Sequence, residues 1–588
     1  MSTHITNVAT VECRRCRCPN YCVSGDGEQR ARDSGVAQFR SAGAGASLEL
    51  LIIRGPPGRR QMGRSRSSRS QPQRSSGMDG GGGGGSAALD DDDAYLDRVR
   101  LVDASDSIEL SKVDRSLSLA DSEDWNFSPR AASPTTFSWN RLLVFMGPGF
   151  LVSTSFVDPG NFDTDIQAGA QFRYELVYVL VGATALGLLL QNLAARLGVV
   201  TGMNLAEICA HEYPGRVRYI LWAIAEVTIV ASDIPEVVGT AFALRFLFGM
   251  PLWIGVIVTS LSVVLFLMVN VFGVRKLELL IGSLIGVVLI CFVGELLMST
   301  ASLGGILGGL IPTFNLRAMY AATSLIGSVV MPHNIFLHSA LVQTRSVRRT
   351  SPAIREACYY NFIESCIALS ISLVINVSIL AMSASEFFPN PHAGLLSAPA
   401  LLQRILKGSA GSTIFAIALL ASGQSSTMTG TYAGQFVMEG FLDLKIEKWA
   451  RALLTRSVAI VPSLIAALVA GEHGADRLII LSQVALSVLL PFSLIPLFKV
   501  TSSHERMGEF ANGRTVKVVV IALGAGVTLA NLALVFAELV PVVGAMGGFT
   551  ALLASCMGLV VFGGYLSLFA YLLVRPVTTH SLLDLKPA

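Results

Sequence analysis

The stretch GPGFLVSTSFVDPGN (residues 147–161) interrupts an apolar segment at the start of a long hydrophobic region. A second interruption, GSVVMPHN (residues 327–334), lies in the sixth apolar segment of that region. Proline removes a backbone N–H donor and clashes with the preceding turn, and glycine tolerates backbone that is not helical. We therefore expect two helices that are each broken in the middle.

The composition around these breaks is typical of a protein that crosses a membrane many times. Hydrophobic residues make up 52% of the 588 residues, charged residues 14%, and the mean hydropathy is +0.58. A soluble domain carries about 25% charged residues. A membrane-crossing helix needs about 20 apolar residues. The sequence predicts an all-α membrane protein with about twelve transmembrane helices, near 142–170, 175–198, 217–248, 251–272, 276–298, 316–345, 356–382, 409–438, 452–470, 477–498, 515–537 and 546–574.

The loops between the predicted spans differ in positive charge. Basic residues concentrate after the even-numbered spans, for example Arg216 and Arg218 after the second and Arg345, Arg348 and Arg349 after the sixth. Because basic loops stay in the cytoplasm, we expect both termini there. The sequence does not distinguish the plasma membrane from a vacuolar or endosomal membrane.

The first part of the chain has a different composition. It holds an Arg/Ser tract (64–76), a glycine run (80–85) and an acidic run (90–93), which cannot bury enough apolar surface to fold. The predicted organisation is a disordered cytoplasmic tail at 1–137, a transmembrane transporter domain at 138–575 and a short cytoplasmic tail at 576–588.

The breaks carry side chains that suit a metal cation. Broken helices at matching positions of two five-span halves point to a transporter site in an inverted repeat. A carboxylate within a membrane span, here Asp158, marks a functional site by default. Asp158 and Asn161 offer oxygen ligands, and Met331 offers a thioether, which favours transition metals over magnesium or calcium. The competing interpretation of Met331 is simple packing.

These motifs resemble those of the Nramp family of proton-coupled divalent metal transporters, in particular its plant-type branch. The resemblance covers residues 140–575 and rests on DPGN at 158–161, on MPHN at 331–334 with His338, and on GQSSTMTGTYAGQ at 423–435. It places the third motif between spans eight and nine.

The resemblance implies a LeuT-like inverted repeat of 5+5 helices in which the first and sixth helices are broken. It implies that the metal ligands are Asp158, Asn161, Met331 and the backbone carbonyl of Ser328. The family usually has alanine at this last position, and a carbonyl ligand tolerates that departure. Gln483 and Asn531 are weaker candidates to complete the shell.

Proton coupling needs a group whose protonation competes with the metal. Asp158 meets this need, because a dry carboxylate prefers its neutral form until a dication arrives. His333 and His338 follow Met331 and titrate near neutrality, so they are candidate relays. For His338, packing in the helix interface is an equal alternative.

Asp233 and Glu236 lie on one face of the third span by their i,i+3 spacing. The resemblance assigns them to proton exit, with Arg451 or Arg456 of the ninth span as a counter-charge. The alternative is a structural ion pair.

Four other acidic residues have simpler interpretations. We expect Asp163 and Asp165 to face an outer vestibule, where they attract cations or are solvated. Glu278 and Glu295 lie near the ends of the fifth span, and we expect both to be interfacial.

The leading hypothesis is a symporter that carries manganese, ferrous iron and related ions with protons toward the cytoplasm by alternating access. One alternative is an Nramp-like signalling protein without transport, which predicts degraded metal ligands and a long soluble C-terminal extension. Another is an organic-solute symporter, which has no need of Asp158 and Met331. No nucleotide loop or hydrolytic constellation appears, so we expect no enzyme, no cofactor, no nucleic acid and no obligate protein partner beside the metal substrate and the bilayer.

Overall fold

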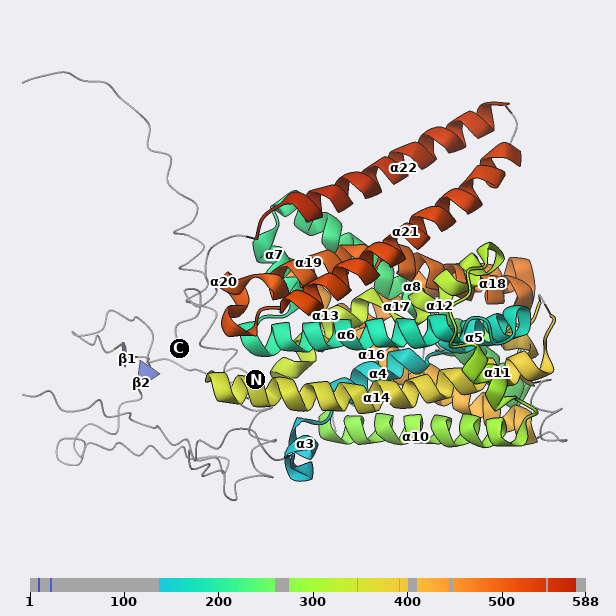
Figure 1. Cartoon of the computed structure of the whole chain (residues 1–588), viewed down its shortest axis with the longest axis horizontal. Coiled ribbons are helices and arrows are strands. Elements are labelled where there is room, and N and C mark those ends of the chain that lie inside the picture. The colour runs from blue at the N-terminus through green and yellow to red at the C-terminus, as the bar shows by residue number, and fades with distance from the viewer. Residues whose placement is uncertain are drawn as a thin grey trace, which may run out of the picture. The chain divides into compact units, whose positions relative to one another are not determined.

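The structure of this chain is a computed structural model (Figure 1). It describes residues 9–10, 22–23, 137–259, 274–345, 347–390, 392–399, 410–443, 448–545 and 548–577. The chain divides into two units, Met1–Phe127 and Ser128–Ala588. In the first unit, strands β1 (Ala9–Thr10) and β2 (Cys22–Val23) pair antiparallel. The predicted disordered tail at 1–137 lies almost wholly outside the described residues.

Every regular element that the structure describes in the second unit is a helix. The label η marks 3-10 helices, except η6, which is a π-helix. The first elements are α3 (Trp139–Phe145), α4 (Pro148–Ser153), η1 (Thr154–Val157), α5 (Pro159–Phe172), α6 (Val177–Thr201), α7 (Leu205–Glu212), α8 (Gly215–Phe248) and α10 (Val274–Met298). Next come α11 (Leu303–Gly308), η3 (Leu316–Ala318), α12 (Met319–Val329), α13 (Pro332–Leu341), η4 (Val342–Thr344), α14 (Ser351–Glu386), η5 (Leu395–Ser397) and α16 (Ala410–Leu442). The last are α17 (Lys448–Ile465), η6 (Ala466–Ala470), α18 (Gly471–Leu489), α19 (Pro491–Ser502), α20 (His504–Met507), η7 (Gly508–Phe510), α21 (Arg514–Ala545) and α22 (Gly548–Val574).

Seven helical stretches of the described chain are long and apolar enough to cross a membrane. They are Val177–Thr201, Gly215–Phe248, Leu316–Thr344, Ser351–Glu386, His473–Ser502, Arg514–Ala537 and Ser555–Val574. Shorter apolar helices cover Pro148–Val157, Gly282–Met298 and Ser457–Val469, within the predicted first, fifth and ninth spans. The predicted fourth span is described only to residue 259, so the count of twelve stays a prediction.

The expectation of two broken helices is confirmed. In the first, the helical path ends with η1, and Asp158 is extended at φ −96° and ψ 167° before α5 begins. In the second, α12 ends at Val329, and Met331 is extended at φ −79° and ψ 124° before α13 begins. Pro159 and Pro332 are the first residues of α5 and α13, where a missing N–H costs nothing.

Long helices support both breaks. Helix α14 packs along α5 and α6, and α16 packs along α8 (Figure 1). Helix α12 packs on α18 so closely that a methyl group on Gly327 would overlap the backbone carbonyl of Gln483. Only glycine permits this approach, which fixes the second broken helix against α18.

The outer surface of the helices is apolar. Large hydrophobic side chains remain exposed, among them Ile290, Leu297 and Val560 at 74%, 81% and 75%. Such a continuous apolar exterior suits contact with lipid rather than water. Many polar side chains are instead buried inside, among them Asp158 and Asn161 at the first break and Ser328 beside the second.

Candidate metal-binding site

The unwound backbone of the first break is held by side chains from two long helices. Asn376 Nδ2 of α14 donates to the Phe156 carbonyl at 2.9 Å, and Ser422 Oγ of α16 donates to the Val157 carbonyl. A buried carbonyl without a donor would be costly, so these bonds stabilise the break. They fix the backbone directly before Asp158.

Asp158 and Asn161 lie together at the start of α5. Asp158 Oδ1 accepts from the Asn161 backbone N–H at 2.6 Å and from Asn161 Nδ2 at 2.7 Å. Asn161 Nδ2 also lies 3.1 Å from the Ser155 and Ser328 carbonyl oxygens. The Ser328 contact joins the two broken helices across 167 positions of sequence. Thr164 adds a second link, because its hydroxyl donates to Ser328 Oγ at 3.1 Å.

Several oxygens of this cluster have no donor. Within the described residues, neither Asp158 Oδ2 nor Asn161 Oδ1 has a hydrogen-bond partner, and both side chains are at most 1% exposed. Gln483 lies against Gly160 of α5, is fully buried, and likewise lacks a partner for its amide among the residues described. Buried acceptors without donors are uncommon and call for an explanation. A cation between these oxygens would supply one.

Met331 occupies the second break and is 1% exposed. It clusters with Ala231 of α8 and Leu486 of α18. In the described part of the chain, no three His, Cys, Asp or Glu side chains form a metal-binding group. The polar atoms at the breaks are therefore those of one carboxylate together with amide and carbonyl oxygens, and Met331 lies at the second break.

The structure does not bring Asn531 into these contacts. Its Nδ2 donates to the Ser487 carbonyl at 2.7 Å, and its Oδ1 accepts from Ser487 Oγ at 2.9 Å. Both polar atoms of Asn531 are thus used in joining α21 to α18.

Both predicted histidines are buried at 1% exposure on α13. His333 Nε2 lies 3.4 Å from Ser232 Oγ, and His338 Nδ1 lies 2.9 Å from Gln191 Oε1 of α6. The second ring nitrogen of each has no partner among the described residues.

Asp233 and Glu236 are buried on α8 at 3% and 1% exposure. The Asp233 carboxylate lies against Gly430 of α16, where an added methyl group would be 2.9 Å from Oδ1. Arg451 and Arg456 are part of α17, but their side chains lie outside the described residues. The predicted pairing with a basic residue stays a prediction.

The third motif was placed between two spans, and this placement is wrong. Residues 423–435 lie inside α16, where Thr429 Oγ1 is 2.7 Å from Thr154 Oγ1 of η1. Gly423 also lies against Thr240 of α8. The motif therefore supports the first break by close helix packing.

Three acidic residues are more buried than expected. Asp163 and Asp165 are fully buried instead of solvated, because η5 folds over this end of α5 and the Leu395 N–H donates to Asp163 at 2.8 Å. Asp165 has no hydrogen-bond partner for either oxygen among the residues described. Glu295 is 3% exposed and therefore buried among helices, while its position near the membrane interface stays a prediction; the Glu278 side chain lies outside the described residues.

Sequence reasoning missed the polar residues of α14 that bind the first broken helix. Besides Asn376, Ser372 Oγ lies 3.3 Å from the Ser153 carbonyl, and Ser383 Oγ donates to the Ile166 carbonyl at 2.5 Å. Their spacing of four and seven residues within an apolar span was the available signal, since it puts all three on one helix face.

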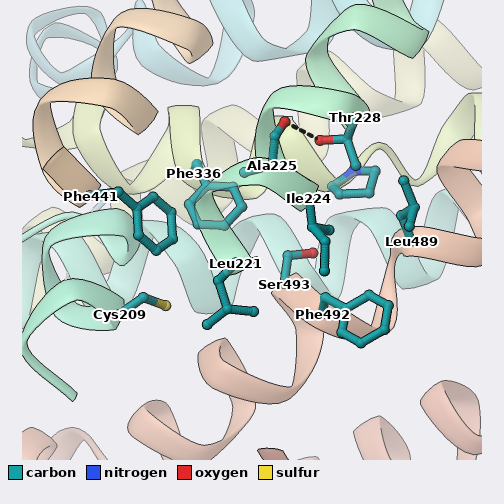
Figure 2. A pocket seen from close by; sticks show the side chains of 11 residues that line it. Cys209, Leu221, Ile224, Ala225, Thr228, Phe336, Phe441, Leu489, Phe492 and Ser493 are labelled. Atoms are coloured by element: carbon teal, nitrogen blue, oxygen red, sulfur yellow. Dashed lines mark hydrogen bonds between the residues drawn. The ribbon is translucent and has the colours of Figure 1, made fainter. Parts of the chain in front are cut away.

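One face of the second broken helix, on α13, meets its surroundings mainly through apolar groups. Pro332 and Phe336 of α13 line a cavity of about 10 Å³ beneath the break. Its other lining residues are Cys209, Leu221, Ile224, Ala225, Thr228, Phe441, Leu489, Phe492 and Ser493 (Figure 2). The Thr228 hydroxyl donates a hydrogen bond to the Ala225 carbonyl at 2.7 Å and is therefore satisfied within its own helix. The lining on this side of α13 is mostly apolar.

Residues 149–537 match the family model described as natural resistance-associated macrophage protein-like, or Nramp. The metal transporter Nramp1 of Populus trichocarpa is 46% identical over 456 residues, which cover 75% of this chain and 84% of that protein. The metal transporter Nramp6 of Arabidopsis thaliana is 48% identical over 402 residues, covering 66% and 76%.

A solved structure has the same arrangement of helices. It is the crystal structure of the manganese transporter of Eremococcus coleocola in complex with an aromatic bis-isothiourea substituted compound. That protein is 34% identical to this chain and superposes with a TM-score of 0.68, covering 77% of this chain and 98% of the other. The expected LeuT-like fold is thereby confirmed.

Proposed function

Because this chain belongs to the Nramp family of metal-ion transporters, we propose that it carries divalent transition-metal ions, manganese and ferrous iron among them, in symport with protons toward the cytoplasm. The observation that supports this proposal is the donor set at the two breaks. Among the described residues, Asp158 Oδ2, Asn161 Oδ1 and Gln483 Oε1 are buried acceptors without donors, next to the Ser328 carbonyl and the Met331 break. One carboxylate beside a thioether favours a transition ion over calcium or magnesium.

Each residue has a distinct role in this mechanism. Asp158 supplies the anionic ligand, and Asn161 holds Oδ1 of that carboxylate so that Oδ2 remains for the cation. Ser328 contributes its carbonyl from the second broken helix, so the metal bridges both halves. Gln483 completes the shell from α18. Met331 selects against calcium by its softness.

Protons would compete with the metal at Asp158, because a dication and a proton neutralise the same carboxylate. His333 and His338 would carry the proton along α13, and Asp233 and Glu236 would release it along α8 beside Arg451 or Arg456. The two broken helices would rock against the long helices and expose the breaks to each side of the membrane in turn.

The test is manganese uptake into proteoliposomes at acidic outside pH, with a lumenal pH dye recording proton entry. We expect Asp158→Ala to reduce uptake at least about a hundredfold, since a buried charged ligand is lost. Met331→Ala should retain uptake but lose about tenfold of the preference for manganese over calcium. Met382→Ala is the matched control, because this methionine of α14 is similarly buried at 2% exposure but lies away from the breaks.

Uptake by Asp158→Ala at the wild-type rate would place the metal elsewhere. Metal uptake without lumenal acidification would reject the proton component alone. A well-folded intact protein that moves no transition metal would favour the signalling alternative.

For localisation, we propose that both termini face the cytoplasm, on the charge asymmetry of the loops. Antibody access to a tag at either end of the chain, in intact and then permeabilised cells, tests this orientation. Labelling of a terminal tag in intact cells would contradict it for a plasma-membrane protein.

A further inference from the structure

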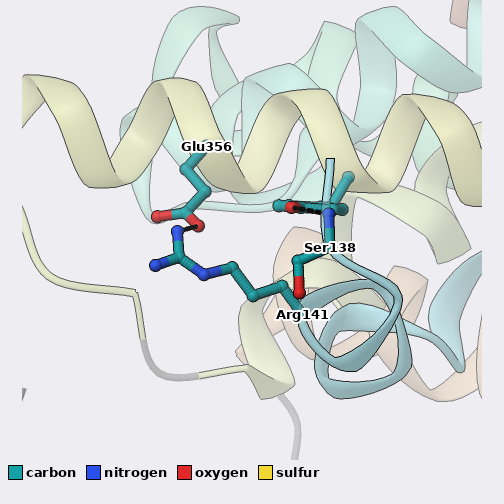
Figure 3. Close-up of polar contacts among 4 residues, drawn as sticks. Ser138, Arg141 and Glu356 are labelled. Atoms are coloured by element: carbon teal, nitrogen blue, oxygen red, sulfur yellow. Dashed lines mark hydrogen bonds and ion pairs between the residues drawn. The ribbon is translucent and has the colours of Figure 1, made fainter. Parts of the chain in front are cut away.

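Helix α14 contacts the chain before the first break at two places, one near the protein surface and one buried. At the shallow level, the Ser138 N–H donates to the Tyr360 hydroxyl at 3.2 Å, and Arg141 forms an ion pair with Glu356 (Figure 3). The Arg141 and Glu356 side chains remain 48% and 25% exposed. Exposed ion pairs of this kind contribute little.

Two turns further along α14, Glu364 makes a different contact. Its Oε1 accepts three backbone N–H groups, from Gly147 at 2.6 Å, Gly149 at 2.9 Å and Phe150 at 3.2 Å. Glu364 is fully buried, and its Oε2 has no hydrogen-bond partner in the described chain. We call these four residues the Glu364 clamp.

The Glu364 clamp requires a glycine at position 149. A methyl group on Gly149 would lie 2.9 Å from Glu364 Cδ, so any larger residue there would push the carboxylate away from the amides. Arg345 reaches the same place from the segment after α13, and its Nη2 donates to the Met146 carbonyl at 2.9 Å. The first half of the broken helix is thus tied to α14 at its very beginning.

This tie is buried, and with an ionised carboxylate it is charge-assisted, which makes it stronger than a neutral contact. It also spans 217 positions of sequence, from the first half of the broken helix to a long supporting helix. Opening of the metal site on the side where the chain enters α4 would require α4 to leave α14. The three bonds to Oε1 must then break together.

We propose that Glu364 is a positioning residue for transport: the Glu364 clamp holds α4 against α14 and sets how readily the metal site opens toward the entry side of α4. The inference rests on the proposed metal transport for its kinetic readout. Its structural readout is independent of transport.

The experiment compares wild type with Glu364→Gln, which keeps the size and the acceptor atom but removes the charge. We expect amide hydrogen exchange in peptides covering 147–157 to become about fivefold to tenfold faster, because neutral bonds are weaker than charged ones. The apparent KM for manganese should rise by about the same factor at a similar maximal rate, because fewer molecules present the site to the outside. Peptides covering 159–172 of α5 should exchange as in wild type.

Two further variants complete the experiment: one is a control, and the other disrupts the Glu364 clamp in a different way. Glu356→Gln removes the exposed pair of Figure 3 on the same helix, and it should leave exchange at 147–157 and the KM unchanged. Gly149→Ala displaces the carboxylate while Glu364 stays intact, so it should reproduce the effects of Glu364→Gln.

Wild-type exchange at 147–157 in folded Glu364→Gln or Gly149→Ala overturns the proposal. If Glu364→Gln aggregates, Gly149→Ala decides, and aggregation of both would also overturn it, because Glu364 would then be needed for folding. Faster exchange with an unchanged KM overturns the positioning role. If wild type transports no metal, the proposed function fails, while the exchange data still decide whether the clamp holds α4.

Discussion

The two broken helices meet at one place, but different forces hold them there. At the first break, Asn376 and Ser422 donate hydrogen bonds to the carbonyls just before Asp158. At the second break, Ser328 and His333 make polar contacts with Asn161 and Ser232. Met331, however, packs among apolar neighbours, and Phe336 lines a mostly apolar cavity (Figure 2). Hydrogen bonds weaken steeply when their geometry changes, whereas apolar contacts have no preferred direction.

This difference predicts how the site moves. The backbone of Phe156 and Val157, directly before Asp158, should keep its local geometry even when α4 moves, because a shift there would leave buried carbonyls without donors. Helix α13 should slide or tilt against α16 and α19 at lower cost, because one apolar contact replaces another there. Damage to the first break should therefore alter metal affinity, and damage to the second should alter the rate.

Gly327→Leu is expected to have the largest effect, because it changes the second broken helix where α12 and α18 pack too closely for any side chain. The added side chain would overlap the Gln483 carbonyl and push α12 from α18. We expect uptake to fall to background and the free energy of unfolding to drop by about 3 kcal/mol. Thermal melting in detergent and manganese uptake measure the two effects. Gly182→Leu on α6 is the control, since a methyl group there meets no atom within 4 Å. Wild-type melting of Gly327→Leu would mean that α12 and α18 are not in such close contact.

Asn376→Leu should have the next largest effect, because it leaves the Phe156 carbonyl buried without its donor. An unsatisfied buried acceptor costs about 1–3 kcal/mol. We expect a lower melting temperature together with a raised KM for manganese, because the backbone before Asp158 loses its support. Val374→Leu introduces the same side chain on the outer face of α14, where Val374 is 47% exposed, and should behave as wild type. If stability falls while the KM is unchanged, this hydrogen bond stabilises the fold but does not set the geometry of the metal site.

The breaks themselves could be predicted from the sequence, because their cause is local. Proline and glycine around Asp158 and Met331 exclude a continuous helix whatever surrounds them. The joining of Asn161 to Ser328 was implied by family resemblance, and the structure brings these two residues together by a hydrogen bond.

What could not be predicted depends on partners far away in sequence. Helical periodicity identifies a polar face on α14, but it does not show that Asn376 meets Phe156 or that Glu364 meets Gly147. Burial of Asp163 depends on η5, which follows α14 and folds back over α5. Hydropathy describes such a segment as a loop, so the acidic residue beneath it appeared to be solvated.

Phe336→Leu should have the smallest effect of the three. It tests the apolar packing around α13 in the second broken helix. Phe336 is 4% exposed, and its ring centre lies 5.9 Å from that of Phe441, so the change enlarges an apolar cavity without leaving any polar group unsatisfied. We expect a loss of about 1 kcal/mol in the free energy of unfolding and an altered maximal rate of uptake, with the KM for manganese within about twofold of wild type. Phe362→Leu on α14 is the control, because Phe362 is 40% exposed at the surface of the helices. If Phe336→Leu raises the KM more than Asn376→Leu does, the second break sets the geometry of the metal site and the assignment of roles is reversed. If only the rate changes, apolar packing around α13 limits its movement, and the hydrogen bonds of the first break set the affinity.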